Sequence, residues 1–300
     1  MGDTMKYALL RCCTTPIVLQ QYEWSTNAVL NKLGIGLVDV KEFGCCGYPL
    51  RNVNFKAYVI SSARNLALSQ RENLDLLTVC NCCYGTMRHI EDLLHNDSSV
   101  RKEVNATLEK EGLVYEGDIK PKHLLQVLYD DLGIEAIRKQ IVYTFKDLNI
   151  ATHYGCRILR PSKIVNFDKP YSPSKFDELV EVTGARSVDW LKKHECCGSP
   201  LWGINEELSL DLTQNKLKHA RKSGADFLCV ACSYCQIQFD HVQKILISRR
   251  GPEYQLPSIL YPQLLGISLG IDSDTLGLYM NQISIKDIEL YLLDKAASQS

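Results

Sequence analysis

Short apolar runs alternate with longer amphipathic stretches along this chain. Six runs of four or five residues predict β-strands, at positions 7–10, 37–40, 76–79, 149–153, 187–191 and 226–230. Apolar residues at helical spacing predict helices, at positions 22–33, 55–71, 84–94, 176–183, 205–222 and 236–248. Strands that alternate with helices are typical of parallel α/β sheets, so we expect an α/β fold in which one unit occurs twice.

The segment between the two units has a different character. Residues 96–147 are rich in charge and carry Gly112, Gly117 and Pro121, with a helical pattern over 122–139. We expect a connector with one or two helices and a solvated surface. After the second unit, the apolar stretch 261–266 predicts a short buried helix.

Length and composition indicate a globular protein with two domains. The chain has 300 residues, with 45% hydrophobic and 23% charged residues, and we expect domains at 1–145 and 146–300. The net charge of -1 provides no overall attraction to nucleic acid or to an anionic membrane. No apolar run reaches the roughly 20 residues that cross a bilayer, and the N-terminus lacks a secretory signal, so we expect a cytoplasmic location.

Thirteen cysteines are the main chemical feature, and ten of them form one pattern that occurs twice. Each copy has a single cysteine, then Cys-Cys-Gly, then Cys-x-x-Cys. The two sets are Cys13, Cys45, Cys46, Cys80, Cys83 and Cys156, Cys196, Cys197, Cys232, Cys235. The gap between the pair and Cys-x-x-Cys is 33 residues in the first copy (47 to 79) and 34 in the second (198 to 231). This near-equal spacing indicates a duplicated module whose chemistry depends on thiolates.

The cysteine clusters follow predicted strands and precede predicted helices. Because the carboxyl ends of parallel strands lie at one edge of a sheet, cysteines far apart in sequence can converge there. The helix N-termini at this edge favour negative charge and lower the pKa of a thiol. We therefore expect one thiolate site in each half.

Other uses of these cysteines fit the pattern less well. Five thiolates exceed the four that a structural zinc or a cubane 4Fe–4S cluster takes, although four of the five could hold a zinc ion. The run Cys229-x-x-Cys232-x-x-Cys235 lacks the fourth cysteine and proline of a ferredoxin motif. A thioredoxin-like use of Cys80 and Cys83 would leave the paired cysteines without a role. A disulfide scaffold is disfavoured by the odd number of cysteines and the reducing cytoplasm.

At these residues the chain resembles the B subunit of heterodisulfide reductase, which is built from two CCG domains. Supporting stretches are Ala63–Ala67, Val79–Gly85, His153–Cys156, Cys235–Asp240 and Gln263–Gly266. The resemblance covers nearly the whole chain. It implies two similar domains in a pseudo-two-fold arrangement, each with a small parallel sheet and flanking helices. It also implies two noncubane 4Fe–4S clusters, one held by each of the two five-cysteine sets.

The resemblance further implies a catalytic activity and partners. The expected function is reduction of the coenzyme M–coenzyme B disulfide to two thiols, with one electron from each of two facing clusters. The expected partners are the flavin-bearing and the ferredoxin-like subunits of the reductase complex, because the chain has no nucleotide-binding loop of its own. The alternatives are a CCG protein of another bifurcating or sulfur-metabolising complex, or a protein that only transfers electrons.

Several residues depart from the family pattern or have more than one interpretation. Cys12 stands where the family has glycine, and Cys13 is the expected ligand because Pro16 follows it by three residues. Cys82 and Cys229 are further extra thiols, which we expect to be small buried residues. His153 is a candidate proton donor or a packed histidine. A group of basic residues could bind an anionic substrate or lie on the surface: Arg11, Arg157, Arg160 and Lys163.

Overall fold

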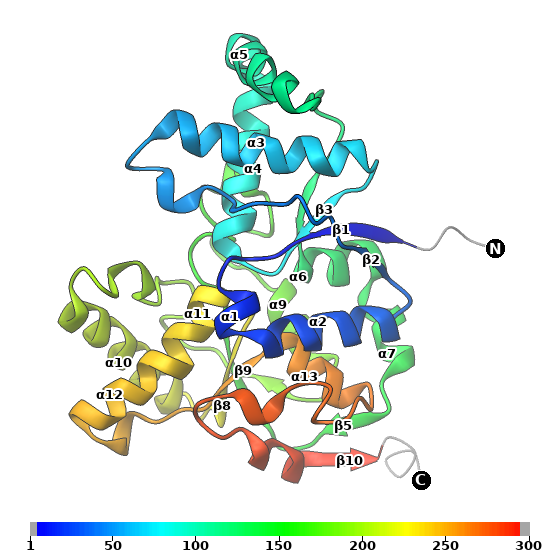
Figure 1. The fold of residues 1–300 in the computed structure, drawn as a ribbon. Helices are drawn as coiled ribbons and strands as arrows, with labels where there is room; N and C mark the ends of the chain where they lie inside the picture. Colours follow the sequence, from blue (N-terminus) through cyan, green and yellow to red (C-terminus); the bar gives the residue numbers. More distant parts are fainter. Residues whose placement is uncertain (1–4, 295–300) are drawn as a thin grey trace.

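A computed structural model describes residues 5–294 and contains two four-stranded sheets, both parallel throughout (Figure 1). The first sheet has the order β2-β1-β3-β4 and comprises β1 (Lys6–Leu10), β2 (Gly36–Val38), β3 (Leu76–Thr78) and β4 (Pro121–His123). The second has the order β7-β6-β8-β9 and comprises β6 (Asn149–His153), β7 (Arg186–Ser187), β8 (Phe227–Val230) and β9 (Ser258–Leu260). Since the strand order is the same, the duplication seen in the cysteine pattern extends to the fold.

The registers show the same equivalence. Ala8 in β1 pairs with Leu76 in β3, and Ile150 in β6 pairs with Phe227 in β8. The central strands are buried on both faces because helices cover each sheet, which explains their nearly continuous apolar sequences. The predicted α/β class with two similar units is confirmed. The fourth strands, β4 and β9, were not predicted, since each is only three residues long and includes polar residues.

Most predicted helices are present, with shifted ends. In the first half the helices are α1 (Thr15–Val18), α2 (Gln20–Lys32), α3 (Phe55–Arg71) and α4 (Asn81–Asn96). In the second half they are α8 (Ser162–Val165), α9 (Lys175–Glu181), α10 (Glu206–Lys222), α11 (Ser233–Ile237), α12 (Gln243–Arg250) and α13 (Tyr261–Ser268). Asn54 and Asn205 cap the equivalent helices α3 and α10, each accepting a backbone hydrogen bond at 3.0 Å.

Two predicted helices are interrupted in the structure. The stretch 236–248 is divided among the end of α11, a π-helical turn (Gln238–Val242) and α12. The stretch 122–139 begins inside β4 and continues as α6 (Leu124–Gln126), a π-helical turn (Val127–Leu132) and α7 (Ile134–Gln140). Gly133, with φ of 88°, separates the turn from α7. The connector also contains α5 (Ser98–Leu108), which the sequence analysis did not predict as a separate helix.

Short 3₁₀ turns complete the described part of the chain, at Tyr48–Leu50, Glu109–Glu111, Ser199–Leu201, Pro252–Tyr254, Leu278–Met280 and Lys286–Tyr291. A small antiparallel pair joins β5 (Tyr143–Phe145) to β10 (Leu292–Asp294). Within residues 5–294, no helix has the length and apolar character required to cross a membrane.

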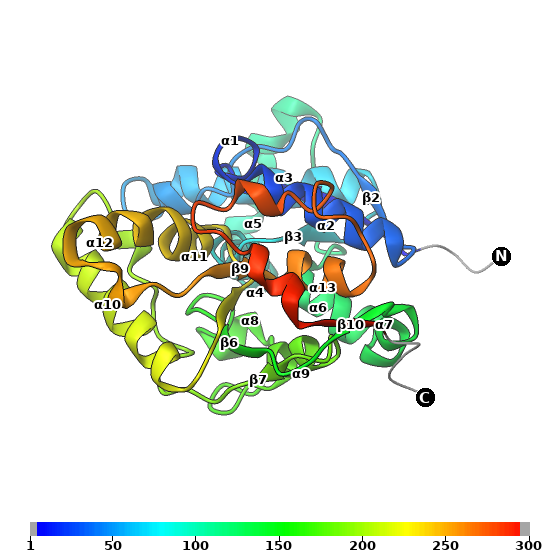
Figure 2. The same cartoon turned by 90° about the horizontal axis from the view of Figure 1, so that it is seen from below.

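The two halves pack closely against each other through helices and share one hydrophobic core. Helix α2, from the first half, lies along α13 of the second half, and α4 packs on α8 (Figures 1 and 2). The Tyr84 hydroxyl in α4 donates a 2.6 Å hydrogen bond to the carbonyl of Val165 at the end of α8. A boundary near residue 145 remains a prediction from the sequence, and the packing shows that the halves are in close contact.

Candidate metal centre

The cysteines of each half follow three strands at the same edge of their sheet. In the first half, Cys12 and Cys13 follow β1, Cys45 and Cys46 lie beyond β2, and Cys80 lies between β3 and α4. In the order β2-β1-β3-β4, the chain adds β2 on one side of β1 and then adds β3 and β4 on the other side. A crevice forms at such a point, beyond the carboxyl ends of the strands, and ligands bind there. The sequence-based placement of the cysteines is therefore confirmed.

A tight turn follows each cysteine pair, in which the second cysteine is buried and the first is more exposed. Gly47 has φ of 85°, and a Cβ atom there would lie 2.9 Å from the carbonyl oxygen of Tyr58. The Gly47 amide lies 3.5 Å from Cys45 Sγ and donates a hydrogen bond to it. Ser62 donates to the carbonyl of Cys46 at 2.7 Å, which fixes the turn against α3. Only glycine adopts this turn without strain and without a clash.

The second half repeats this turn in detail. Gly198 has φ of 98°, and its amide lies 3.5 Å from Cys196 Sγ. Thr213 in α10 donates to the carbonyl of Cys197 at 3.4 Å, in the place of Ser62. Equal geometry at both turns shows that the two Cys-Cys-Gly sequences build equivalent sites.

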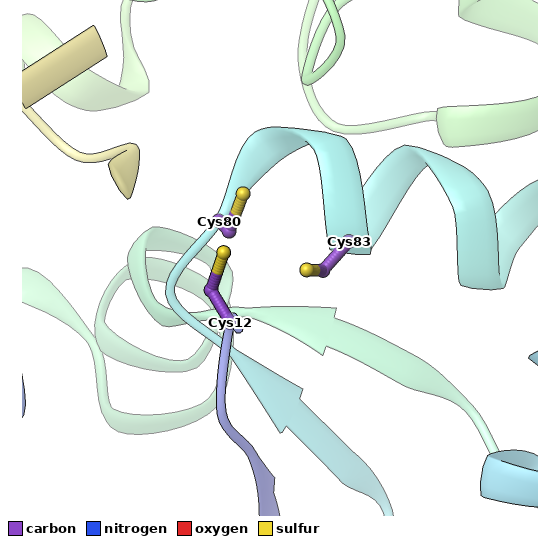
Figure 3. A group of neighbouring side chains, drawn as sticks. All are labelled: Cys12, Cys80 and Cys83. Carbon is purple, nitrogen blue, oxygen red and sulfur yellow. The ribbon is translucent and has the colours of Figure 1, made fainter. Parts of the chain in front are cut away.

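The thiols of the first half form a continuous group. Cys13 contacts Cys45, Cys46 contacts Cys83, and Cys80 contacts Cys83 through thiol hydrogen bonds. Figure 3 shows Cys12, Cys80 and Cys83, whose Sγ atoms all lie within 4.8 Å of one another and are buried. Soft thiolates at this density are ligands that zinc, copper and iron–sulfur clusters prefer.

The second half has the equivalent group without a counterpart of Cys12. Cys156 contacts Cys196, Cys197 contacts Cys235, and Cys235 contacts Cys232. The structure thus gathers all ten predicted cysteines into two groups of five. It also adds Cys12 to the first group, a contact that the preference for Cys13 did not anticipate.

The two groups meet at the interface between the halves. Cys80 and Cys232, the first residue of each Cys-x-x-Cys, lie close enough for each thiol to shift the pKa of the other. A small, mostly apolar cavity lies beside this contact, lined by Tyr48, Asn81, Cys82, Cys156, Arg157, Cys196, Cys197, Pro200, Cys232, Tyr234 and Cys235. All five cysteines of the second set line this cavity, whereas the first half contributes Tyr48, Asn81 and Cys82 and none of its five predicted ligands.

The pKa values of neighbouring thiols are shifted in opposite directions. Hydrogen bonds from Cys13 and Cys46 lower the pKa of Cys45, and those from Cys156 and Cys197 lower that of Cys196. The donating thiols have raised pKa values, because each keeps the proton that it shares. Adjacent thiolates repel one another, so the groups can ionise together only when a cation binds among them. The donor set therefore fits a bound metal cluster.

Arg157 supplies positive charge to the cavity. Its guanidinium carbon lies 5.5 Å from the centre of the Tyr48 ring, and its Nε and Nη2 atoms are buried without a hydrogen-bond partner in the described residues. Arg157 is half-buried, and two guanidinium nitrogens without a partner favour an anionic ligand at this position. The sequence analysis proposed either this role or a surface position for Arg157, and the structure supports the first.

The other basic candidates are more exposed. Arg11 pairs with Glu23 at 2.6 Å and with Asp39, while Arg160 and Lys163 are exposed. Tyr48 and Tyr234 line the cavity but were missed in the sequence analysis. Both could have been identified from their positions in the sequence motifs. Tyr48 directly follows Cys-Cys-Gly, and Tyr234 occupies the second variable position of Cys-x-x-Cys, where the first half has Cys82.

His153 lies inside the second half and does not line the cavity. Its ring packs edge-on against Phe239, with 5.0 Å between ring centres, and both ring nitrogens lack a hydrogen-bond partner in the described residues. Burial holds its pKa well below the ordinary value, so the imidazole is neutral. A role as proton donor stays a prediction. Cys229 is fully buried in β8, in agreement with a small core residue.

Comparisons with known proteins agree with this geometry. The CCG family model, described as a cysteine-rich domain, matches residues 7–88 and 150–240. The chain is 36% identical to the B subunit of the ferredoxin/F420H2-dependent CoB-CoM heterodisulfide reductase of Methanosarcina acetivorans, over 93% of this chain and 94% of that protein. It is 29% identical to the 8-methylmenaquinol:fumarate reductase membrane anchor subunit of Wolinella succinogenes, over 93% and 97%.

A solved structure shares the fold. The crystal structure of a hypothetical protein from Helicobacter pylori superposes with a TM-score of 0.76 at 19% identity, over 95% of this chain and 53% of that one. At this identity the likeness concerns the fold alone.

Proposed function

Because the chain belongs to the family of heterodisulfide reductase B subunits, with two CCG domains, we propose that it is the iron–sulfur component of a complex that reduces a disulfide. The favoured substrate is the coenzyme M–coenzyme B disulfide, the substrate named for the Methanosarcina relative. The observation that carries this proposal is the contact between Cys80 and Cys232, which joins the two thiol groups beside one cavity.

The proposed cofactors are two noncubane 4Fe–4S clusters. Five thiols in each half exceed the four ligands of a cubane cluster, and the soft donor set suits iron and sulfide. One cluster would be held by Cys13, Cys45, Cys46, Cys80 and Cys83. The other would be held by Cys156, Cys196, Cys197, Cys232 and Cys235. When bound, each cluster supplies one electron at a time.

Reduction of a disulfide needs two electrons and two protons, breaks the S–S bond and releases two thiols. The duplication suits this reaction, because a substrate with two sulfur atoms lies between two sites that each provide one electron. The chain's own groups would bind and orient the substrate: Arg157 holds an anionic group, and the Tyr48 and Tyr234 rings contribute apolar surface that excludes water. The Tyr48 and Tyr234 hydroxyls hold protons beside the cavity, and His153 remains a second candidate donor.

The proposed partners are the flavin-bearing and the ferredoxin-like subunits of the reductase. The Methanosarcina relatives are named as B subunits, which places those proteins in reductases of several chains. An electron source outside this chain is needed, since the sequence has no nucleotide-binding loop.

A second candidate function is electron transfer within a different complex. The Wolinella relative is named as part of a fumarate reductase, so related chains occur in complexes with another substrate. Turnover of a disulfide distinguishes the two functions, because a protein that only transfers electrons has no substrate of its own to reduce.

The test uses the purified complex that contains this chain. We expect turnover of the coenzyme M–coenzyme B disulfide with release of both thiols, measured by thiol titration with a one-electron donor. Metal analysis of the purified chain by itself should return roughly eight iron and eight sulfide. Zinc without sulfide would overturn the cofactor proposal, and iron–sulfur clusters without turnover of any disulfide would favour the electron-transfer alternative.

A further inference from the structure

One buried charge distinguishes the two otherwise equivalent sites. Lys216 in α10 is 2% exposed, and its Nζ donates to the carbonyl of Glu195 at 3.1 Å and to that of Lys192. Glu195 directly precedes Cys196, so this ammonium group lies against the loop that carries the cysteine pair. Lys216 forms no ion pair with a carboxylate in the described residues. The thiols of Cys197 and Cys235, and after them the Glu195 carboxylate, interact favourably with its charge.

The equivalent residue in the first half is neutral. Asn65 occupies the same position in α3, and its Nδ2 donates to the carbonyls of Gly44 and Cys45 at 3.4 and 3.1 Å. Gly44 precedes Cys45 as Glu195 precedes Cys196. Asn65 is 1% exposed, so both residues secure the same loop from the same buried place. Only the residue in the second half carries a charge.

A second difference adds a thiol to the first site. Cys12 precedes Cys13, whereas Gly155 precedes Cys156 at the equivalent place after β6. The Cys12 Sγ atom lies within 4.8 Å of both Cys80 and Cys83, which is a separation that a shared metal ligand allows (Figure 3). At Gly155, a Cβ atom would lie 2.9 Å from Asn81 Nδ2, so the second site has no room for this sixth thiol.

We propose that the two clusters have unequal reduction potentials and that the cluster of the second half accepts an electron first. Lys216 acts as a positioning residue whose charge stabilises the reduced, more negative cluster, and Cys12 acts as a sixth thiolate ligand that disfavours reduction of the first. Charges act strongly in a buried site, because the surroundings screen them weakly. Net charge and hydrogen bonds at the sulfur atoms set iron–sulfur potentials. The inference rests on the two clusters proposed above.

The test is a potentiometric titration of the purified full-length chain, followed by electron paramagnetic resonance. Each cluster takes one electron from a one-electron reductant, and no substrate is present. We expect two signals with different midpoint potentials. The variants Cys45→Ser and Cys196→Ser assign them, because each removes the signal of its own half.

In each of two variants, a residue of one half is replaced by the residue type found at the equivalent position of the other half. Lys216→Asn copies Asn65 and should lower the midpoint potential of the second signal. Cys12→Gly copies Gly155 and should raise that of the first. Lys218→Asn is the matched control: it removes the same charge from the exposed face of α10, where water screens it, and should leave both midpoints unchanged. Lys216→Gln serves as a second neutral variant if Lys216→Asn folds poorly.

The outcomes separate this inference from the proposed function. Equal midpoints in the unchanged protein, a lower midpoint for the second half, or no shift in Lys216→Asn would overturn the inference while the clusters remain demonstrated by iron and sulfide content. If Cys12→Gly left the midpoint potential of the first-half cluster unchanged, Cys12 would not be a ligand of that cluster. Absence of iron and sulfide would instead overturn the proposed function itself.

Discussion

Cys80 and Cys232 contact each other through their thiols across the interface between the two halves. Each is the N-cap residue of a helix, α4 in one case and α11 in the other. Two helix N-termini thus converge on one point, and their partial positive charges favour anionic thiolates there. The two thiol groups therefore adjoin each other where the halves meet.

Loss of one ligand should empty one site and leave the other. We expect Cys232→Ser to retain about half of the iron and sulfide of the unchanged protein and one of its two spectral signals. Disulfide reduction should fall to background, because the second electron has no source. Cys229→Ala is the control, since Cys229 is buried in β8 and its pKa is perturbed by burial alone. Turnover at the parent rate by Cys232→Ser would contradict the two-cluster mechanism.

Replacement of Gly47 should disturb the first cysteine pair. Gly47→Ala forces an alanine to φ of 85° and places its Cβ 2.9 Å from a backbone oxygen, which should destabilise the fold by more than about 1 kcal/mol and reduce iron content. Gly44→Ala lies in the same loop, where a Cβ meets no atom within 4 Å, and should be nearly neutral. Urea unfolding and iron analysis measure both effects. Equal behaviour of the two variants would refute the strain argument.

Removal of the Arg157 guanidinium should weaken binding of an anionic disulfide. We expect Arg157→Gln to raise KM about 10- to 100-fold with little change in kcat, because hydrogen bonds to a charged group contribute about 1.5–3 kcal/mol. A neutral disulfide should show no such change. Lys163→Gln is the matched control, since Lys163 is exposed close by in the sequence. The anion-binding role would be excluded by the same KM change for both substrates.

His123 should make stability depend on pH. Burial lowers its pKa from 6.5 to about 4, so below pH 6.5 the unfolded chain binds a proton that the folded chain does not. The free energy of unfolding should therefore fall as the pH decreases from 6.5 towards 4, by about 1 kcal/mol between pH 7.5 and 5.5.

The measurement compares urea unfolding of the unchanged protein and His123→Asn at these two pH values. Asn preserves an acceptor for the Leu125 amide, which His123 Nδ1 accepts at 3.2 Å, and it does not titrate. The variant should lose about 1 kcal/mol of the pH dependence. A pH dependence equal to that of the unchanged protein would show that His123 is not responsible.

The first three strands of each sheet, the longer helices and the edge on which the cysteines lie could be predicted from the sequence, because each depends on local periodicity and on a general property of parallel sheets. Helix α3 matches its predicted bounds, 55–71, because Asn54 caps one end and polar residues follow the other. Strand β4 could not be predicted, since its pairing with β3 compensates for its short and polar sequence.

The finer features of the site depend on contacts between distant residues. Nothing in the sequence near Cys12 shows that it lies beside Cys80 and Cys83, because that contact is created by the pairing of β1 with β3. The same holds for Arg157, whose position beside Tyr48 depends on how the halves pack. The proximity of the Lys216 charge to the second cysteine pair depends on the packing of α10 against the loop before Cys196, which the sequence does not show.

The packing of helices across the two halves means that neither half is a self-sufficient domain. A single module cut from this chain would lose the partner surface of α2 or α13 and would expose apolar residues such as Leu30 and Leu265 to water. The repeat is therefore not two independent copies joined by a linker. Each half covers apolar surface of the other. We therefore expect the two halves to unfold together, so that a destabilising mutation in either half affects both cysteine groups.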